Sequence, residues 1–315
     1  MARKKRLITT ISCLGVLVLV ILVLIPTLVL SMFLGERIDQ PQHNSIEFGI
    51  ASEEINLTTI DGLNLAAWRT YTDKAIPYGT VIIISGLQWP SVTAFFGYAN
   101  MLAEHGWDAL LIEKRARSLS EGESIGFGTT EWLDVKAGVN FLDADNRSGD
   151  LPIIALGTSA GGATVIIAGG EIPRIDGIIA ISAYSNFVDL YVDSLPMFRV
   201  PRFVGTMSIP FMYLNMGLRL GFDRIRYTPI NGIARLGHRP MLLMHSTEDW
   251  QVPFSHFENL YQTAQESNIN ITTFVREGDW HFVCYDQYIG NPARDVEFTQ
   301  AIIGFLDQFQ SRILD

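Results

Sequence analysis

Three side chains far apart in the sequence could together carry out nucleophilic catalysis: a serine, a histidine and an aspartate. Ser159 lies in Gly-Thr-Ser-Ala-Gly, between an apolar run at 153–156 that predicts a strand and an expected helix at 162–168. A sharp turn of this kind strains the backbone and lifts the serine hydroxyl clear of its neighbours. His281 is the candidate base that takes the hydroxyl proton, and Asp249 is the candidate carboxylate that orients the imidazole and stabilises its charge.

The histidine and the aspartate each have a simpler structural interpretation. Asp249 could cap the helix that begins near Pro253, and Glu248 is then the neighbouring candidate acid. His281 could be a loop histidine packed beside Trp280. The other histidines are weaker candidates for the base, since they fall at a strand end, on a helix, near turns or in the N-terminal region. They are His43, His105, His238, His245 and His256.

The elements that must position these groups alternate between strands and helices. Period-two apolar alternation on both sides of Asp61-Gly62 predicts an antiparallel hairpin. Continuous apolar runs predict buried strands at 80–85, 108–113, 153–156, 175–182, 241–246 and 271–275. Helical spacing predicts helices at 94–105, at 132–142 with Thr130 as N-cap, at 162–168, at 254–264 with Pro253 in the first turn, and at 296–309. The pattern therefore predicts an α/β fold with a mostly parallel sheet covered by helices on both faces.

Four segments in this region, from about Ile55 to the C-terminus, resemble motifs of the α/β-hydrolase superfamily. They are GTSAG at 157–161, HSTEDWQVP at 245–253, GDWH at 278–281 and EKRARSLSEG at 113–122. The chain order serine, acid, histidine is also the order in that superfamily. Within it, the sequence is most similar to serine hydrolases related to dienelactone hydrolases and S33-type aminopeptidases. The resemblance implies an α/β-hydrolase domain over 53–315 that forms an acyl-enzyme on its serine.

The same resemblance implies an oxyanion hole made by the backbone NH groups of Leu87 and Ala160. Losing one such donor typically lowers turnover by about 10² to 10³. The sequence departs from the superfamily pattern nearby, because Ser85 stands where a histidine is frequent. Ala116 and Arg117 also depart from the motif in 113–122. These departures leave open a catalytically silent hydrolase fold that acts as a tethered binding protein.

The N-terminus has the features of a membrane anchor. A basic segment, 1–6, precedes an uncharged run, 7–34, which is longer than the roughly 20 residues that cross a bilayer. The run exceeds the apolar region of a cleaved signal peptide and lacks a small-x-small site. The basic residues before it predict a single-pass protein with a cytoplasmic N-terminus and a catalytic domain outside the cytoplasm. The polar stretch 35–52 is expected as a linker.

The composition and charge of the chain limit the kinds of partner and cofactor that we expect it to bind. A net charge of −10 without a long run of one sign disfavours a nucleic-acid partner. No cluster at metal-ligand spacing and no phosphate-binding glycine loop is present in the sequence, so we expect chemistry without a metal or a cofactor. Cys284 is the single cysteine outside the membrane run, which excludes a disulfide within the domain and favours a small buried apolar role.

An insertion at 183–240 is too long for a simple connection between strands, and it is rich in apolar and aromatic residues. By resemblance it forms a cap over the serine, which favours an apolar acyl or aryl substrate. Alternatively, its apolar residues simply pack on the sheet. A second membrane span at 203–218 is disfavoured, because the run is short and meets Arg219.

The leading hypothesis is a membrane-anchored serine hydrolase that cleaves a carboxylic ester. A peptidase or amidase on the same triad is the enzymatic alternative. An aminopeptidase would need acidic cap residues to hold a substrate ammonium group, and Asp189, Asp193 and Asp223 are the candidates.

Overall fold

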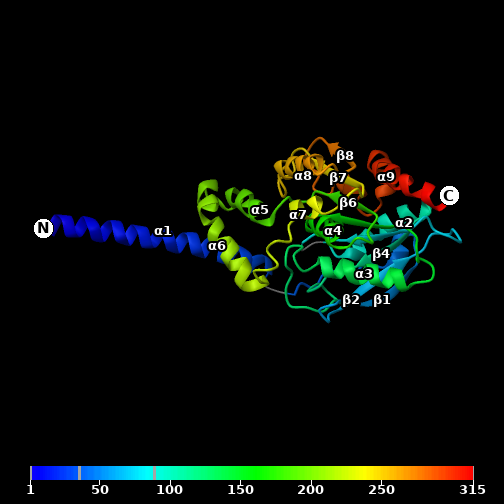
Figure 1. Ribbon diagram of the computed structural model, residues 1–315, viewed down its shortest axis with the longest axis horizontal. Coiled ribbons are helices and arrows are strands. Elements are labelled where there is room, and N and C mark those ends of the chain that lie inside the picture. The colour runs from blue at the N-terminus through cyan, green and yellow to red at the C-terminus, as the bar shows by residue number, and fades with distance from the viewer. Residues whose placement is uncertain (1, 35–36, 88–89, 315) are drawn as a thin grey trace.

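An eight-stranded sheet forms the centre of the computed structural model, which describes residues 2–34, 37–87 and 90–314 (Figure 1). The strands are β1 (Ser52–Thr58), β2 (Asn64–Thr70), β3 (Thr80–Ile84), β4 (Asp108–Ile112), β5 (Ile153–Thr158), β6 (Gly177–Ile181), β7 (Met241–Ser246) and β8 (Ile271–Arg276). Their order across the sheet is β1-β2-β4-β3-β5-β6-β7-β8. β2 pairs antiparallel with both β1 and β4, and the other neighbours pair parallel. The predicted mostly parallel sheet is confirmed.

Strands β1 and β2 form the predicted hairpin. Ile55 pairs with Ala67, and Leu57 pairs with Leu65. Gly62 in the connecting turn has a φ of +89°, a value that glycine adopts without a Cβ clash.

Some helices cover the two faces of the sheet and others lie beside it. The helices are α1 (Ala2–Leu34), α2 (Phe96–Glu104), α3 (Trp132–Ala144), α4 (Ala160–Glu171), α5 (Phe187–Ser194), α6 (Arg202–Leu220), α7 (Pro229–Ala234), α8 (Ser255–Glu266) and α9 (Val296–Leu314), with short 3₁₀ turns at Ser45–Phe48, Val92–Phe95, Leu195–Phe198, Asp286–Tyr288 and Pro292–Arg294. Ile82 and Ile84 of β3 pack in the apolar layer that includes α3, α4, α7 and α8. Val81 and Ile83 of the same strand pack in the opposite layer with α2 and α9. This alternation explains why β3 is apolar at every position.

Two predicted helix starts are wrong in detail. Glu131, not Thr130, occupies the N-cap of α3, and its side chain makes no cap hydrogen bond. Its carboxylate instead accepts hydrogen bonds from the backbone NH groups of Gly126 (2.9 Å) and Gly128 (2.8 Å) in the preceding loop. Pro253 precedes α8 instead of lying in its first turn, since the helix begins at Ser255.

The N-terminal helix α1 extends away from the sheet, and its last turns lie beside α6 (Figure 1). Its apolar part, Thr9–Met32, is long and apolar enough to cross a membrane. The expected linker, 35–52, is described from Arg37 onward and follows the surface of the domain. Ile38 forms a parallel bridge with Arg117, and the backbone NH of His43 donates to Thr93 Oγ1 at 3.0 Å.

The insertion 183–240 divides into two parts. α5 and α6 build an apolar cluster with the end of α1 and with Ala160, separate from the two layers of the sheet. In contrast, α7 packs against α4 and α8, and its Ile233 belongs to the layer on the sheet. We call the first part, 183–220, the cap.

Candidate active site

Ser159 lies in a strained turn between β5 and α4. Its φ of +55° and ψ of −121° are rarely adopted by residues other than glycine. A Cβ on Gly157 would collide with the carbonyl of Gly161, and one on Gly161 would collide with the carbonyl of Ile84, so both glycines are required. The Ser159 backbone NH donates to the Ile181 carbonyl at 2.7 Å, while its hydroxyl does not cap α4. The hydroxyl is therefore left available at the start of the helix.

Asp249 and His281 are directly paired. His281 Nδ1 lies 2.8 Å from Asp249 Oδ2, in the geometry of a hydrogen bond. The other carboxylate oxygen accepts hydrogen bonds from the backbone NH groups of Gln251 (2.9 Å) and Val252 (3.0 Å). Asp249 thus shapes the turn before α8 and holds the imidazole. It does not cap the helix, since the N-cap of α8 is Phe254.

The ionised form of Asp249 is favoured by its neighbours. Burial raises the pKa of the carboxyl, but the hydrogen bond and the charge of His281 outweigh burial and hold this pKa below its usual value. Glu248 is exposed, so it does not replace Asp249 as the buried acid. Trp280 packs edge-to-face on Tyr285 with a ring separation of 5.0 Å. The neighbouring His281 contacts Asp249, so it is more than a loop histidine beside Trp280.

The serine and the aspartate–histidine pair lie at the same edge of the sheet. Ser159 follows β5, whereas Asp249 follows β7 and His281 follows β8, and these strands are parallel. Parallel strands bring their carboxyl ends to one edge, where ligands bind in open α/β sheets. Within the described residues, no hydrogen bond joins the Ser159 hydroxyl to His281. The structure thus joins the acid to the histidine and leaves the contact of the histidine with the serine as a prediction.

Two other histidines near the site have structural roles. His245 is buried, its Nε2 lies 2.8 Å from the Val252 carbonyl, and burial lowers its pKa. His256 is also buried on α8, where its Nδ1 accepts from the Ser185 backbone NH at 3.2 Å. Burial lowers the pKa of His256 to about 4, which keeps this imidazole neutral at physiological pH.

The motif at 113–122 supports the loop that carries the candidate oxyanion donor Leu87. The guanidinium of the fully buried Arg117 donates to the Leu87 carbonyl from Nε (3.1 Å) and from Nη2 (2.9 Å). Lys114 Nζ donates to the Ser85 carbonyl at 3.2 Å. Ala116 has a φ of +57° in a motif where the superfamily has glycine. Arg117 departs from the superfamily motif, and its guanidinium supports the loop by binding the Leu87 carbonyl.

Sequence reasoning missed the supporting roles of Lys114 and Arg117. Their signal was a cluster of cationic residues placed directly after the buried strand β4. Burial, followed by the charge of Arg117, lowers the pKa of Lys114 to about 7. Glu113 on the same segment accepts a hydrogen bond from Ser91 Oγ at 2.8 Å, which ties down the far end of the loop.

A cavity of about 270 Å³ opens next to the serine. We call it the acyl cavity. Its walls are formed by Val29, Leu87, Ser159, Phe187, Leu190, Tyr191, Ser194, Met197, Trp250, Gln251 and Val252. Its volume is just below the roughly 300 Å³ at which ligand pockets typically begin. None of these described wall residues is acidic, and Asp193, a candidate for binding a substrate ammonium group, pairs with Arg202 at 2.6 Å.

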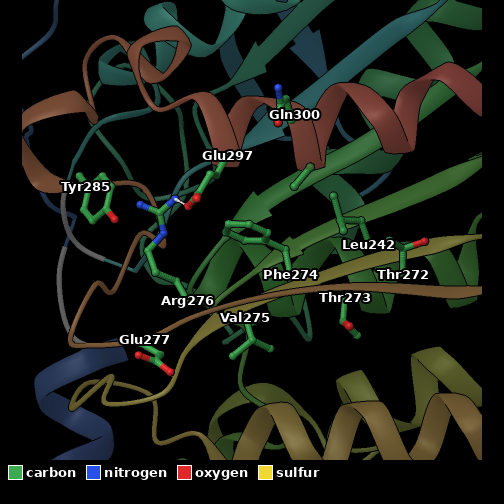
Figure 2. Close-up of a pocket in the computed structure, with 11 residues that line it drawn as sticks. Leu242, Thr272, Thr273, Phe274, Val275, Arg276, Glu277, Tyr285, Glu297 and Gln300 are labelled. Carbon is green, nitrogen blue, oxygen red and sulfur yellow. Dashed lines mark ion pairs between the residues drawn. The ribbon is translucent and has the colours of Figure 1, made fainter.

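A larger depression, of about 700 Å³, lies on the outer side of the edge strand β8 and does not include Ser159 (Figure 2). Phe274 and Val275 are among its walls. Its cation, Arg276, is paired with Asp295 through two contacts of 2.8 Å. This depression is the open border of the sheet, and the catalytic candidates lie elsewhere.

The sheet order, the strained serine turn and the helices on both faces define the α/β-hydrolase fold. No protein-family model matches the chain. Among solved structures, it is similar to an esterase from Pyrococcus furiosus, with a TM-score of 0.65 and 20% identity over 84% of this chain and 98% of that chain. It is also similar to the Pyrococcus horikoshii acylaminoacyl peptidase, with a TM-score of 0.61 and 14% identity over 85% of this chain and 44% of that chain. At these identities the likeness establishes the fold.

Relatives are also found by sequence. The uncharacterized protein YfhR of Salmonella typhimurium is 24% identical over 257 residues, which cover 80% of this chain and 82% of that protein. The uncharacterized protein YqkD of Bacillus subtilis is 25% identical over 210 residues, which cover 65% of this chain and 66% of that protein.

Proposed function

We propose that this protein is a membrane-anchored serine hydrolase that cleaves a carboxylic ester of an apolar acyl group. The observation that carries the proposal is the position of Ser159, at a strained turn that opens into the acyl cavity. The hydrogen-bonded pair of Asp249 and His281 at the same sheet edge supports it. The esterase among the structural neighbours is consistent with this activity.

In the proposed reaction, Ser159 Oγ attacks the ester carbonyl while His281 Nε2 takes the hydroxyl proton. Asp249 holds Nδ1 of the same ring and stabilises the imidazolium. The backbone NH groups of Leu87 and Ala160 donate to the oxyanion. The bond from the carbonyl carbon to the alcohol oxygen then breaks, and the proton passes to the leaving alcohol. Water attacks the acyl-enzyme by the reverse proton path, which releases the acid and restores the serine.

The test uses the full-length protein in a mild detergent. We expect a fluorophosphonate probe to label wild type and p-nitrophenyl esters to be hydrolysed, whereas Ser159→Ala loses both. Ser267→Ala, which changes a serine at the end of α8, is the matched control and should retain both. Equal behaviour of wild type and Ser159→Ala would exclude the mechanism.

The same assays separate the two alternatives. Cleavage of aminoacyl amides in preference to esters would indicate a peptidase. The described wall of the acyl cavity offers no carboxylate for a substrate ammonium group, so we expect esters to be preferred. Tight binding of an ester without turnover, unchanged in Ser159→Ala, would indicate the tethered binding protein.

The proposed topology has the basic N-terminus in the cytoplasm and the domain outside it. Cys284 is buried and Cys13 lies within α1, so the chain suits cysteine labelling. We expect a membrane-impermeant thiol reagent to label Ser267→Cys, in a Cys13→Ser background, on intact cells. Labelling that requires cell lysis would show that the domain lies in the cytoplasm instead.

A further inference from the structure

The end of α1 forms part of the wall of the acyl cavity. Val29 lines the cavity together with Ser159. Leu30, one residue further along, has 0% exposure and belongs to the apolar cluster of the cap. Thr27 Oγ1 lies 3.1 Å from Asn215 Oδ1 of α6, a polar contact between the two helices. The proposed anchor is therefore joined to the substrate site.

The length of α1 places this junction within the bilayer. From Leu7 to Ile21 the helix has about 15 residues, or roughly 22 Å at about 1.5 Å per residue. The hydrocarbon core is about 30 Å thick, so the span must continue to about Pro26 or beyond. Leu22 is already buried, and Ile25 packs against the apolar cluster of the cap. A stretch of helix that is needed to cross the membrane thus already touches the cap.

The exposed side of α1 in this stretch is also apolar. Leu24, Leu28 and Met32 recur every four residues and remain exposed, opposite the buried Val29 and Leu30. Since the cap leaves this stripe uncovered, lipid is the environment that its chemistry fits.

The cap also has an exposed apolar surface, on α6, the helix that packs against α1. Four side chains of α6 lie along one side of the helix, because their spacing follows the helical period. They are Phe203, Met207, Leu214 and Leu218, with exposures of 64%, 54%, 47% and 70%. We call this stripe the cap apolar face. Arg219, which is exposed, flanks it at the C-terminal end of α6, where a long cationic side chain can reach lipid headgroups.

Two exposed apolar side chains line the acyl cavity. Its exposed wall residues include Met197 and Trp250, and Met197 immediately precedes the exposed Phe198, which leads into α6. An indole at a cavity mouth suits a membrane–water interface, because its ring is amphipathic.

We infer that the substrate is an ester of a membrane lipid, and that its acyl chain reaches Ser159 from the bilayer by passing between Val29 and the cap. This inference rests on the proposed function and adds the substrate class to it. Ser159 Oγ takes the acyl group from the lipid alcohol, and water then releases it as a fatty acid. A second copy of the chain could also cover an apolar face, but α6 packs against the proposed membrane span of α1, and this favours lipid.

The experiment compares two substrates of the full-length protein in phosphatidylcholine vesicles: dioleoylglycerol in the bilayer and p-nitrophenyl butyrate in solution. We expect Met207→Asp to lower the release of fatty acid at least tenfold and to leave butyrate hydrolysis unchanged, because Met207 is outside the cavity wall. Ile76→Asp is the matched control. Ile76 is 69% exposed on the loop before β3, and this variant should change neither rate.

A direct measurement accompanies the kinetics. An environment-sensitive fluorophore is attached to Met207→Cys or to Ile76→Cys, each in a Cys13→Ser background. Spin-labelled lipid should quench the fluorescence of the label at position 207 and leave that of the label at position 76 unchanged.

Each failure has a distinct meaning. If wild type neither hydrolyses p-nitrophenyl butyrate nor reacts with the fluorophosphonate probe, the proposed function itself is refuted. If wild type hydrolyses butyrate but releases no fatty acid, or if Met207→Asp keeps the ratio of the two rates, the lipid inference is overturned. Conversion of a dimer into a monomer by Met207→Asp, with that ratio unchanged, would assign the face to a second copy.

Discussion

Replacing Arg117 by methionine tests whether the motif at 113–122 positions the oxyanion hole. Arg117 binds the carbonyl of Leu87 through two nitrogens, at 3.1 and 2.9 Å, and binds the carbonyl of Ala116 at 2.7 Å. Methionine fills a similar volume and removes all three donors. Leu87, whose NH is the candidate oxyanion donor, then loses the contacts that hold its carbonyl, although no reacting atom is touched.

The expected effects on stability and on catalysis differ. Hydrogen bonds to a charged group contribute about 1.5 to 3 kcal/mol each, but the variant also removes a buried cation. Burial lowers the pKa of Arg117, and the charges of Glu131 and Glu113 partly oppose this effect. The cation is therefore costly to bury, and replacing it by methionine removes that cost from the folded state. We therefore expect a net loss of about 1 to 3 kcal/mol in the free energy of unfolding. Displacing one oxyanion donor should lower kcat by about 10² to 10³.

The assay measures kcat and KM on a soluble p-nitrophenyl ester, together with thermal unfolding. KM should change little, because the acyl cavity is intact. Arg239→Met is the matched control, since Arg239 also makes three hydrogen bonds to backbone carbonyls and burial also lowers its pKa. Those carbonyls precede β6 and β7, at the edge of the sheet opposite to the catalytic candidates. This control should lose stability to a similar degree and keep its kcat.

Rescue separates positioning from general damage. Arg117→Lys retains a cation that can donate to the Leu87 carbonyl, so it should recover part of kcat. A fall in kcat that merely follows the loss of stability, in Arg117→Met and Arg239→Met alike, would refute a positioning role. Unchanged kcat in a folded Arg117→Met would refute it as well.

Three further predictions concern the acid and the anchor. Asp249→Asn should keep the fold and lower kcat by about 10⁴, measured on a soluble ester, because His281 loses its charged partner; a loss below tenfold would exclude Asp249 as the acid. Because the folded-state pKa of Asp249 is depressed, its stabilisation is complete above the unfolded pKa of about 4 and disappears as pH falls through the folded value. The difference in Tm between wild type and Asp249→Asn should therefore shrink below about pH 4, and a difference that grows would contradict this sign. Leu30→Ala should lower the free energy of unfolding in detergent by about 2 to 5 kcal/mol, because Leu30 is fully buried, whereas the exposed Leu28→Ala should change it little; equal effects would show that α1 does not pack on the cap.

The strands and the serine turn could be predicted because their signals are local. A continuous apolar run such as that of β3 reports burial on both faces, and the glycines around Ser159 report a turn that no larger residue can form. The pairing of Asp249 with His281 was accessible for a related reason, since both follow late strands of a parallel sheet. The N-cap of α3 was missed because the carboxylate of Glu131 binds a loop upstream of the helix, a contact without a local pattern.

The role of α1 in the site could not be predicted from the sequence. The contact between Thr27 and Asn215 joins residues 188 positions apart, and periodicity carries no information over that separation. An apolar side chain such as Leu30 also has the same sequence signature whether it meets lipid or protein. The contact of Arg117 could not be predicted for a different reason. Its departure from the motif could be recognised, but its partner is a backbone carbonyl, which every residue carries and no sequence pattern marks.

The chain is fastened to the domain immediately after α1. The Ile38 NH donates to the Ala116 carbonyl at 3.3 Å, and the Ser118 NH donates to the Ile38 carbonyl at 2.9 Å. If α1 spans a membrane as we propose, this fastening and the packing of α1 on α6 would hold the domain in one orientation and at one height, whereas a loose tether would let it tumble. The proposed lipid hydrolase would then meet its substrate by diffusion in the plane of the bilayer. Its rate then follows the surface density of the substrate, so adding inert lipid would slow it even at constant bulk concentration.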